Sequence, residues 1–83
     1  MKTIILTDAA AKDLARLPEH DQAAIESALE DYAIWGRGNV IALQGRAGFR
    51  MRVGAYRVIF DEDATTILAI YIGRRSTTTY TRN

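Results

Sequence analysis

Cysteine is absent from this 83-residue sequence, and histidine and proline occur only once each. Without cysteine the chain cannot form disulfides, present a thiolate nucleophile or bind a metal through sulfur. The lone histidine, His20, argues against a multi-histidine metal site and against a Ser-His-Asp triad. We expect His20 to lie at the surface, and we expect the chain to use neither a metal nor an organic cofactor.

Long apolar runs are missing as well. The longest covers residues 67–72, whereas a transmembrane helix needs about 20 apolar residues. The apolar N-terminus is interrupted by Asp8, which is too early for the core of a signal peptide. With 48% hydrophobic and 25% charged residues, the composition is typical of one globular domain that spans residues 1–83. These features predict a cytoplasmic protein with no membrane association.

The net charge of +1 conceals an uneven distribution of charge. Residues 1–35 carry seven acidic and three basic side chains, whereas residues 36–83 carry eight arginines and only three acidic side chains. Arginine grips phosphate through a planar, bidentate guanidinium, which lysine lacks. The second half of the chain is therefore a candidate for binding an anionic partner, unless its arginines are simply scattered over the surface.

Two helices are predicted in the first half of the chain. Thr7 or Asp8 can cap a helix that runs through Leu17, and Pro18 ends it and begins a second helix that runs to about Trp35. After this helix the apolar period changes from 3.6 to 2 residues. Strands are predicted at residues 2–6, 40–43, 49–53, 56–60 and 66–72. This order predicts an α+β fold, with the two N-terminal helices on one face of a small, mainly antiparallel sheet of four or five strands.

A tight hairpin is predicted around Gly54-Ala55, because a two-residue loop with glycine first is what a type II′ turn requires. The turn sets the register: Phe49 pairs with Phe60, Arg50 with Ile59, Met51 with Val58, Arg52 with Arg57, and Val53 with Tyr56. Directly opposed residues share a face of the sheet. One face is therefore apolar and is expected beneath the helices. The other carries Arg50, Arg52, Arg57 and Ile59.

The predicted register places Arg52 opposite Arg57, with Arg50 nearby. Like charges directly opposed on a sheet destabilise it by up to about 1 kcal/mol, so the arrangement favours a face that binds an anion. Two other interpretations remain open. The guanidinium groups could bend outward into water, or the acidic residues 61–63 could fold back and neutralise them.

The last predicted strand, residues 66–72, is apolar on both faces, which is typical of an interior strand. Regular alternation divides it into two sets: Ile67, Ala69 and Tyr71 on one face, and Leu68, Ile70 and Ile72 on the other. If alternation continues, Arg74 and Arg75 point to opposite faces, so only one of them can join the other arginines. Tyr80 could pack on the edge of the sheet or serve the arginine surface.

Three stretches of the sequence carry a resemblance. They are Leu43-Gln44-Gly45, the run R-x-R-V-G-x-Y-R-V-I-F at residues 50–60, and Ile72-Gly73-Arg74-Arg75 followed by Tyr80. Together they resemble the RelE/ParE superfamily of bacterial toxin–antitoxin toxins, over roughly residues 3–80. The resemblance implies a RelE-like fold, a type II toxin–antitoxin system and a cognate acidic antitoxin encoded nearby.

Two activities occur among such toxins. The resemblance implies either a metal-independent endoribonuclease that cuts mRNA in the ribosomal A site, or a ParE-like inhibitor of DNA gyrase. A non-catalytic nucleic-acid-binding relative is a third interpretation. ParE-like chains commonly lack an arginine–tyrosine ending, so Arg75 and Tyr80 favour the ribonuclease.

The resemblance also assigns roles to individual residues. It implies that Arg57, Arg75 and Tyr80 are catalytic and that Arg50 and Arg52 bind the substrate. Two further substrate-binding candidates come from the residues themselves: Arg74, at the end of the last strand, and Tyr71, on which a base could stack. The 2′-OH of the RNA would attack the adjacent phosphate, Tyr80 would accept its proton, and the arginines would stabilise charge on the phosphate. RelE-like toxins often have lysine at the positions of Arg50 and Arg52. Because arginine stays protonated at neutral pH, these two residues are expected to act through their charge alone.

Overall fold

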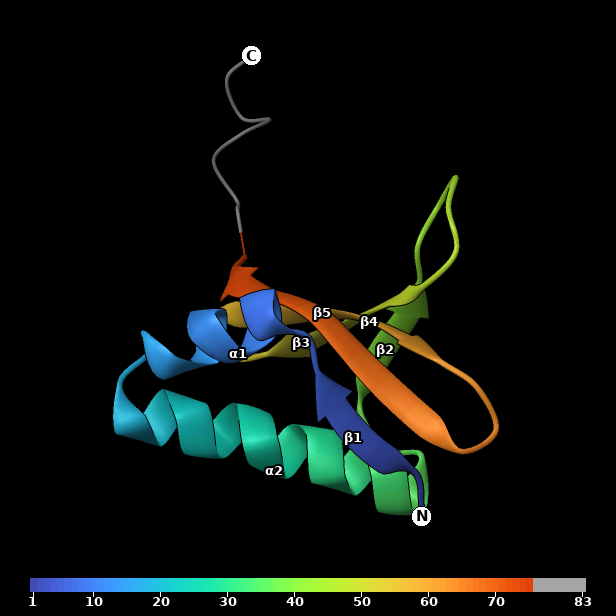
Figure 1. Ribbon diagram of the computed structural model, residues 1–83, viewed down its shortest axis with the longest axis horizontal. Helices are drawn as coiled ribbons and strands as arrows, with labels where there is room; N and C mark the ends of the chain where they lie inside the picture. The colour runs from blue at the N-terminus through green and yellow to red at the C-terminus, as the bar shows by residue number, and fades with distance from the viewer. Residues whose placement is uncertain (76–83) are drawn as a thin grey trace.

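The computed structural model describes residues 1–75, in which the chain forms two helices and five strands (Figure 1). In chain order these are β1 (Thr3–Leu6), α1 (Asp8–Ala15), α2 (Glu19–Trp35), β2 (Asn39–Ala42), β3 (Phe49–Val53), β4 (Tyr56–Glu62) and β5 (Thr66–Arg74). The strands form one sheet in the order β1-β5-β4-β3-β2. Strand β1 runs parallel to β5, and the other neighbours are antiparallel. The predicted α+β class and mainly antiparallel sheet are confirmed.

The helices begin and end at residues that suit those positions. Thr7 caps α1, since its hydroxyl oxygen accepts a hydrogen bond from the backbone N–H of Ala10 at 3.1 Å. This helix ends at Ala15, two residues before the predicted end, because the residue that precedes Pro18 is disfavoured in the helical conformation. The second helix ends at Trp35, as predicted, and is capped by Gly36, whose φ of 69° lies in the left-handed region.

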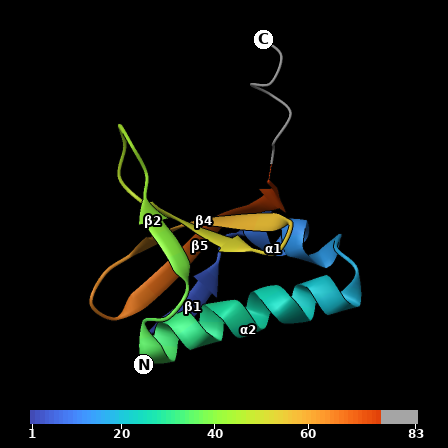
Figure 2. The same cartoon turned by 180° about the vertical axis from the view of Figure 1, so that it is seen from behind.

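Both helices cover the same face of the sheet, as Figures 1 and 2 show. The core between the layers includes Ala10 from α1, and Ile25 and Leu29 from α2. Seven residues of the sheet are buried against them: Met51, Tyr56, Val58, Phe60, Ile67, Ala69 and Ile72. We call the other side of the sheet the open face, because no helix or strand of residues 1–75 packs over it. No helix in this range is long and apolar enough to cross a membrane.

The β3–β4 hairpin has the predicted register at all five pairs, with Arg52 opposite Arg57 and Val53 opposite Tyr56. Gly54 has a positive φ of 57°, whereas Ala55, like every other non-glycine residue in 1–75, has a negative φ. Positive φ at the first turn residue alone is the property that a type II′ turn requires. The hairpin prediction is therefore confirmed in both its turn and its faces.

The predicted alternation along the last strand is wrong in its second half. Ile59 of β4 pairs with Tyr71, but the next residue, Phe60, pairs with Ala69. Ile70 is thus an extra residue in β5, and such a bulge reverses which face the following side chains occupy. Tyr71 consequently lies on the open face with Ile59, whereas Ile72 is buried in the core.

Candidate functional site

Three arginines lie on the open face of the β3–β4 hairpin. Arg50 and Arg52 come from β3 and Arg57 from β4, and Arg52 and Arg57 are direct cross-strand neighbours. Opposed side chains on a sheet have Cβ atoms roughly 5 Å apart, so the side chains of Arg52 and Arg57 leave the sheet next to each other. We call these three residues the arginine face.

The acidic residues 61–63 do not neutralise the arginine face. Glu62 accepts hydrogen bonds from Lys2 at 3.1 Å and from the Tyr32 hydroxyl at 2.9 Å. Asp63 accepts backbone N–H bonds from Thr65 and Thr66, which lower the pKa of its carboxyl. Within residues 1–75, the ion pairs that form involve other cations, and none reaches the three arginines.

The arginines do not all bend out into water either. Arg52 is exposed, but Arg50 and Arg57 are half-buried, and their Nε atoms are buried without a hydrogen-bond partner among the described residues. Leaving a buried donor unpaired costs about 1–3 kcal/mol, and more for a charged group. Of the three interpretations given above, the described residues favour a surface that receives an anion.

A hollow of about 340 Å³ lies beside Arg57 on the open face. Its lining consists of Leu43, Gln44, Arg46, Arg57, Ile59, Ile70 and Tyr71. The loop between β2 and β3 forms one wall; it is closed by a hydrogen bond from the Leu43 N–H to the Gly48 carbonyl at 3.0 Å. In Figure 1 this loop rises from the sheet on the side away from α2.

Sequence reasoning missed two residues of this hollow, Gln44 and Arg46, as site residues. Gln44 precedes Gly45, and Arg46 lies between Gly45 and Gly48 in a glycine-rich turn. A basic residue in such a turn, next to an arginine-rich strand, was the available signal for Arg46.

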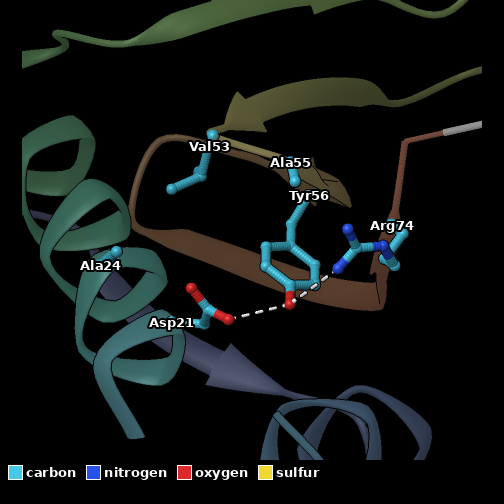
Figure 3. Close-up of a pocket in the computed structure, with 7 residues that line it drawn as sticks. Asp21, Ala24, Val53, Ala55, Tyr56 and Arg74 are labelled. Carbon is cyan, nitrogen blue, oxygen red and sulfur yellow. Dashed lines mark hydrogen bonds between the residues drawn. The ribbon is translucent and has the colours of Figure 1, made fainter. Parts of the chain in front are cut away.

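Arg74 lies on the helix side of the sheet, away from the arginine face. Its guanidinium carbon is 5.4 Å from the centre of the Tyr56 ring, and Nη1 donates to the Tyr56 hydroxyl at 3.3 Å. Tyr56 in turn donates to the Asp21 carboxylate at 2.9 Å (Figure 3). The hydrogen bond to Asp21, together with burial, raises the pKa of Tyr56 above its ordinary value. This cluster ties β5 to α2, and each of its charged groups already has a partner.

Arg75 follows β5 and lies at the hairpin turn. Its backbone N–H donates to the Ala55 carbonyl at 2.8 Å, and its Nη1 donates to the Gly54 carbonyl at 3.1 Å. These contacts place Arg75 at the same end of the sheet as Arg52 and Arg57. Tyr80, the remaining predicted catalytic residue, lies outside the described residues.

The fold of this chain matches those of several solved structures. No protein-family model and no curated protein matches the sequence. Among solved structures, a chain of the toxin–antitoxin complex RelBE2 from Mycobacterium tuberculosis is 29% identical, with a TM-score of 0.77 over 89% of this chain and 98% of that one.

Two further structures share the fold at lower identity. The archaeal RelE–RelB complex from Pyrococcus horikoshii is 20% identical, with a TM-score of 0.79 over 93% of this chain and 98% of the other. The isolated RelE toxin of E. coli is 14% identical, with a TM-score of 0.78 over 95% of this chain and 89% of the other.

Proposed function

Because the chain is a RelE-like protein of the RelE/ParE toxin superfamily, we propose that it is the toxin of a type II toxin–antitoxin pair and that it cleaves mRNA on the ribosome. One observation carries the proposal. The arginine face holds three guanidinium groups together with no acidic partner among residues 1–75, and two of their Nε atoms are buried and unpaired. A phosphate would supply the missing negative charge.

The chemistry follows from the side chains that are present. The 2′-OH of the RNA attacks the adjacent phosphorus, and the bond to the 5′-oxygen of the next nucleotide breaks. This gives a 2′,3′-cyclic phosphate and a 5′-OH, whose proton comes from water. Arg52 and Arg57 stabilise the charge that develops on the non-bridging oxygens, and Arg75 stabilises the phosphate or the leaving oxygen. The resemblance assigns Tyr80 to accept the proton of the 2′-OH.

The proposed site has little acid–base chemistry of its own. Arginine cannot exchange protons at neutral pH, and His20 lies at the start of α2, where its Nε2 atom is 3.1 Å from Asp21. Such a site depends on the precise placement of its substrate, which can account for much of the rate enhancement of an enzyme. A ribosome that presents mRNA in the A site supplies that placement.

An antitoxin is the second partner of the proposed toxin. The M. tuberculosis structure is that of a toxin–antitoxin complex, and the P. horikoshii structure is that of a RelE–RelB complex. In this chain an acidic segment would complement the arginine face, and exposed apolar groups at the margin of the sheet would anchor it. Trp35, at the end of α2, is 64% exposed and is approached by the Arg37 guanidinium at 5.5 Å; with Leu43 it is the anchor that we expect.

The proposal is tested by mapping mRNA ends on purified translating ribosomes. The wild-type chain should cut within the A-site codon. Arg57→Ala should lower the rate by about 10²–10³-fold, and Tyr80→Phe, which keeps the ring but removes the proton acceptor, by about 10²–10⁴-fold. Arg16→Ala, which removes the same charge from the exposed end of α1, is the matched control and should leave the rate unchanged.

Two results would overturn the assignment. Intact mRNA together with broken chromosomes, and undiminished toxicity of Tyr80→Phe, would indicate a gyrase inhibitor. Absence of any toxicity on induced expression would indicate a non-catalytic relative.

A further inference from the structure

The ring of Tyr71 lies over Gly73 on the open face. A Cβ atom built on Gly73 would collide with the hydroxyl oxygen and the adjoining ring carbon of Tyr71. Gly73 does not have a positive φ, so the backbone does not itself demand glycine there. The absent side chain instead leaves room for the phenol, which extends along β5 toward the position of Arg57, the cross-strand partner of Gly73.

This placement leaves part of the Tyr71 ring accessible. One side of the ring rests on the strand, and the residue is 44% exposed. Exposed aromatic rings on a sheet are platforms on which nucleobases stack. Stacking adds to the binding free energy for any of the four bases, because every base has a π-face.

The hollow beside Tyr71 has the chemistry of a base-binding site. Its floor is apolar, formed by Ile59 and Ile70, and the bulge at Ile70 is the feature that brings Tyr71 to this face. Gln44 adds an amide that both donates and accepts hydrogen bonds, as is needed to read the edge of a base. Arg57 forms the boundary between the hollow and the arginine face.

We propose that this hollow binds one nucleobase of single-stranded RNA, stacked on Tyr71, and that Gly73 is the residue that seats the ring. The inference rests on the proposed function, because it places the base next to the phosphate held at Arg57. A phosphate alone would not require an apolar floor or an aromatic platform. A base that enters here is flanked by Arg46 and Arg57, which neutralise the phosphates on either side of it. Contacts with Gln44 then make this hollow a source of codon preference.

Binding is measured with the purified chain and a trinucleotide that carries 2-aminopurine and a 2′-deoxy sugar, so that it cannot be cleaved. Stacking quenches the fluorescence of 2-aminopurine. Wild type and Tyr71→Phe, which keeps the ring, should quench it equally. Tyr71→Ala removes the platform and Gly73→Ala displaces it, and each should weaken binding by about 5- to 150-fold. A trinucleotide with an abasic site at the same position should bind wild type and Tyr71→Ala alike.

Cleavage on ribosomes is the second arm. Gln44→Ala should change the relative rates among A-site codons, whereas Tyr71→Ala should lower the rates at all of them. The subsite is overturned if Tyr71→Ala and Gly73→Ala bind the fluorescent trinucleotide like wild type. It is also overturned if Tyr71→Ala weakens only the complex with the antitoxin, which would make the hollow a protein contact.

The two proposals fail separately. Base-dependent quenching without any cleavage would leave the subsite standing and reject the ribonuclease. If wild type cleaves mRNA and neither Tyr71→Ala nor Gly73→Ala changes binding or cleavage, the ribonuclease stands and the subsite is rejected. Circular dichroism on each variant identifies loss of the fold, and Tyr71→Ala, at an exposed position, tests the platform even if Gly73→Ala does not fold.

Discussion

The two faces of the sheet differ in whether their charged side chains have partners. On the helix side Lys2 and Tyr32 meet Glu62, and Arg74 meets Tyr56. On the open face Arg50, Arg52 and Arg57 have no acidic partner among residues 1–75. The difference separates cations that contact other parts of the fold from the cations that we propose bind the substrate. Under this proposal arginine has two roles in the sheet, and its neighbours across the sheet decide which.

Both faces nevertheless depend on each other. The Asp13 carboxylate accepts the backbone N–H of Ile72 at 3.1 Å, beyond the end of β1. Together with the Tyr56–Arg74 contact this bond secures the end of β5, where Arg75 reaches the hairpin turn. The contacts on the helix side thus support the hairpin turn, next to which Arg52 and Arg57 lie.

The largest effect on stability is expected from the core of the helix side. Phe60 is fully buried, and its ring centre is 5.5 Å from those of Phe49 and Tyr32. Phe60→Ala should lower the free energy of unfolding by about 3–5 kcal/mol, measured by urea denaturation. Ile41→Ala, at a half-exposed position of the edge strand β2, is the control. If Ile41→Ala lowered the free energy of unfolding as much as Phe60→Ala, the open face would contribute as much to stability as the core.

An intermediate effect is expected in the complex with the antitoxin. Removing a charged partner from an interface typically costs 2 kcal/mol or more. Changing Arg52 and Arg57 together to alanine should therefore weaken the toxin–antitoxin complex by at least about 30-fold. The measurement is calorimetric titration of the purified partners, with Arg16→Ala as the control. Undiminished affinity of the double variant would show that the antitoxin docks elsewhere.

A smaller effect is expected from the Tyr56 hydroxyl. Its pKa is raised in the folded chain, first by the hydrogen bond to Asp21, so the folded state holds this proton more tightly than the unfolded state. The resulting stability is fully present below the unfolded pKa of about 10 and is lost as pH rises above it. The free energy of unfolding of wild type should fall above about pH 10, and Tyr56→Phe should show a shallower decline. If the free energy of unfolding fell equally steeply with pH in wild type and Tyr56→Phe, the Tyr56 hydroxyl would not account for the decline.

Much of the fold could be predicted because single residues determine it. Pro18 separates the helices, and Gly54 sets the turn from which the register of the arginine face follows. The bulge at Ile70 could not be predicted, because nothing in an all-apolar strand marks the residue that is left unpaired. Its consequence, the move of Tyr71 to the open face, is a property of tertiary packing. The hollow could not be predicted either, because the path of the loop, which brings Gln44 and Arg46 to it, is also set by tertiary packing; only the basic residue in a glycine-rich turn marked Arg46.

The most direct measurement replaces both opposed arginines by methionine, which keeps their aliphatic stems and removes their charge. If the open face is kept for a ligand, Arg52→Met with Arg57→Met should leave the free energy of unfolding unchanged or raise it by up to about 1 kcal/mol, because the repulsion between the two is relieved. Ribosomal cleavage of mRNA should fall by at least about 10²-fold in the same variant. A variant that loses stability while cleaving at the wild-type rate would contradict the account.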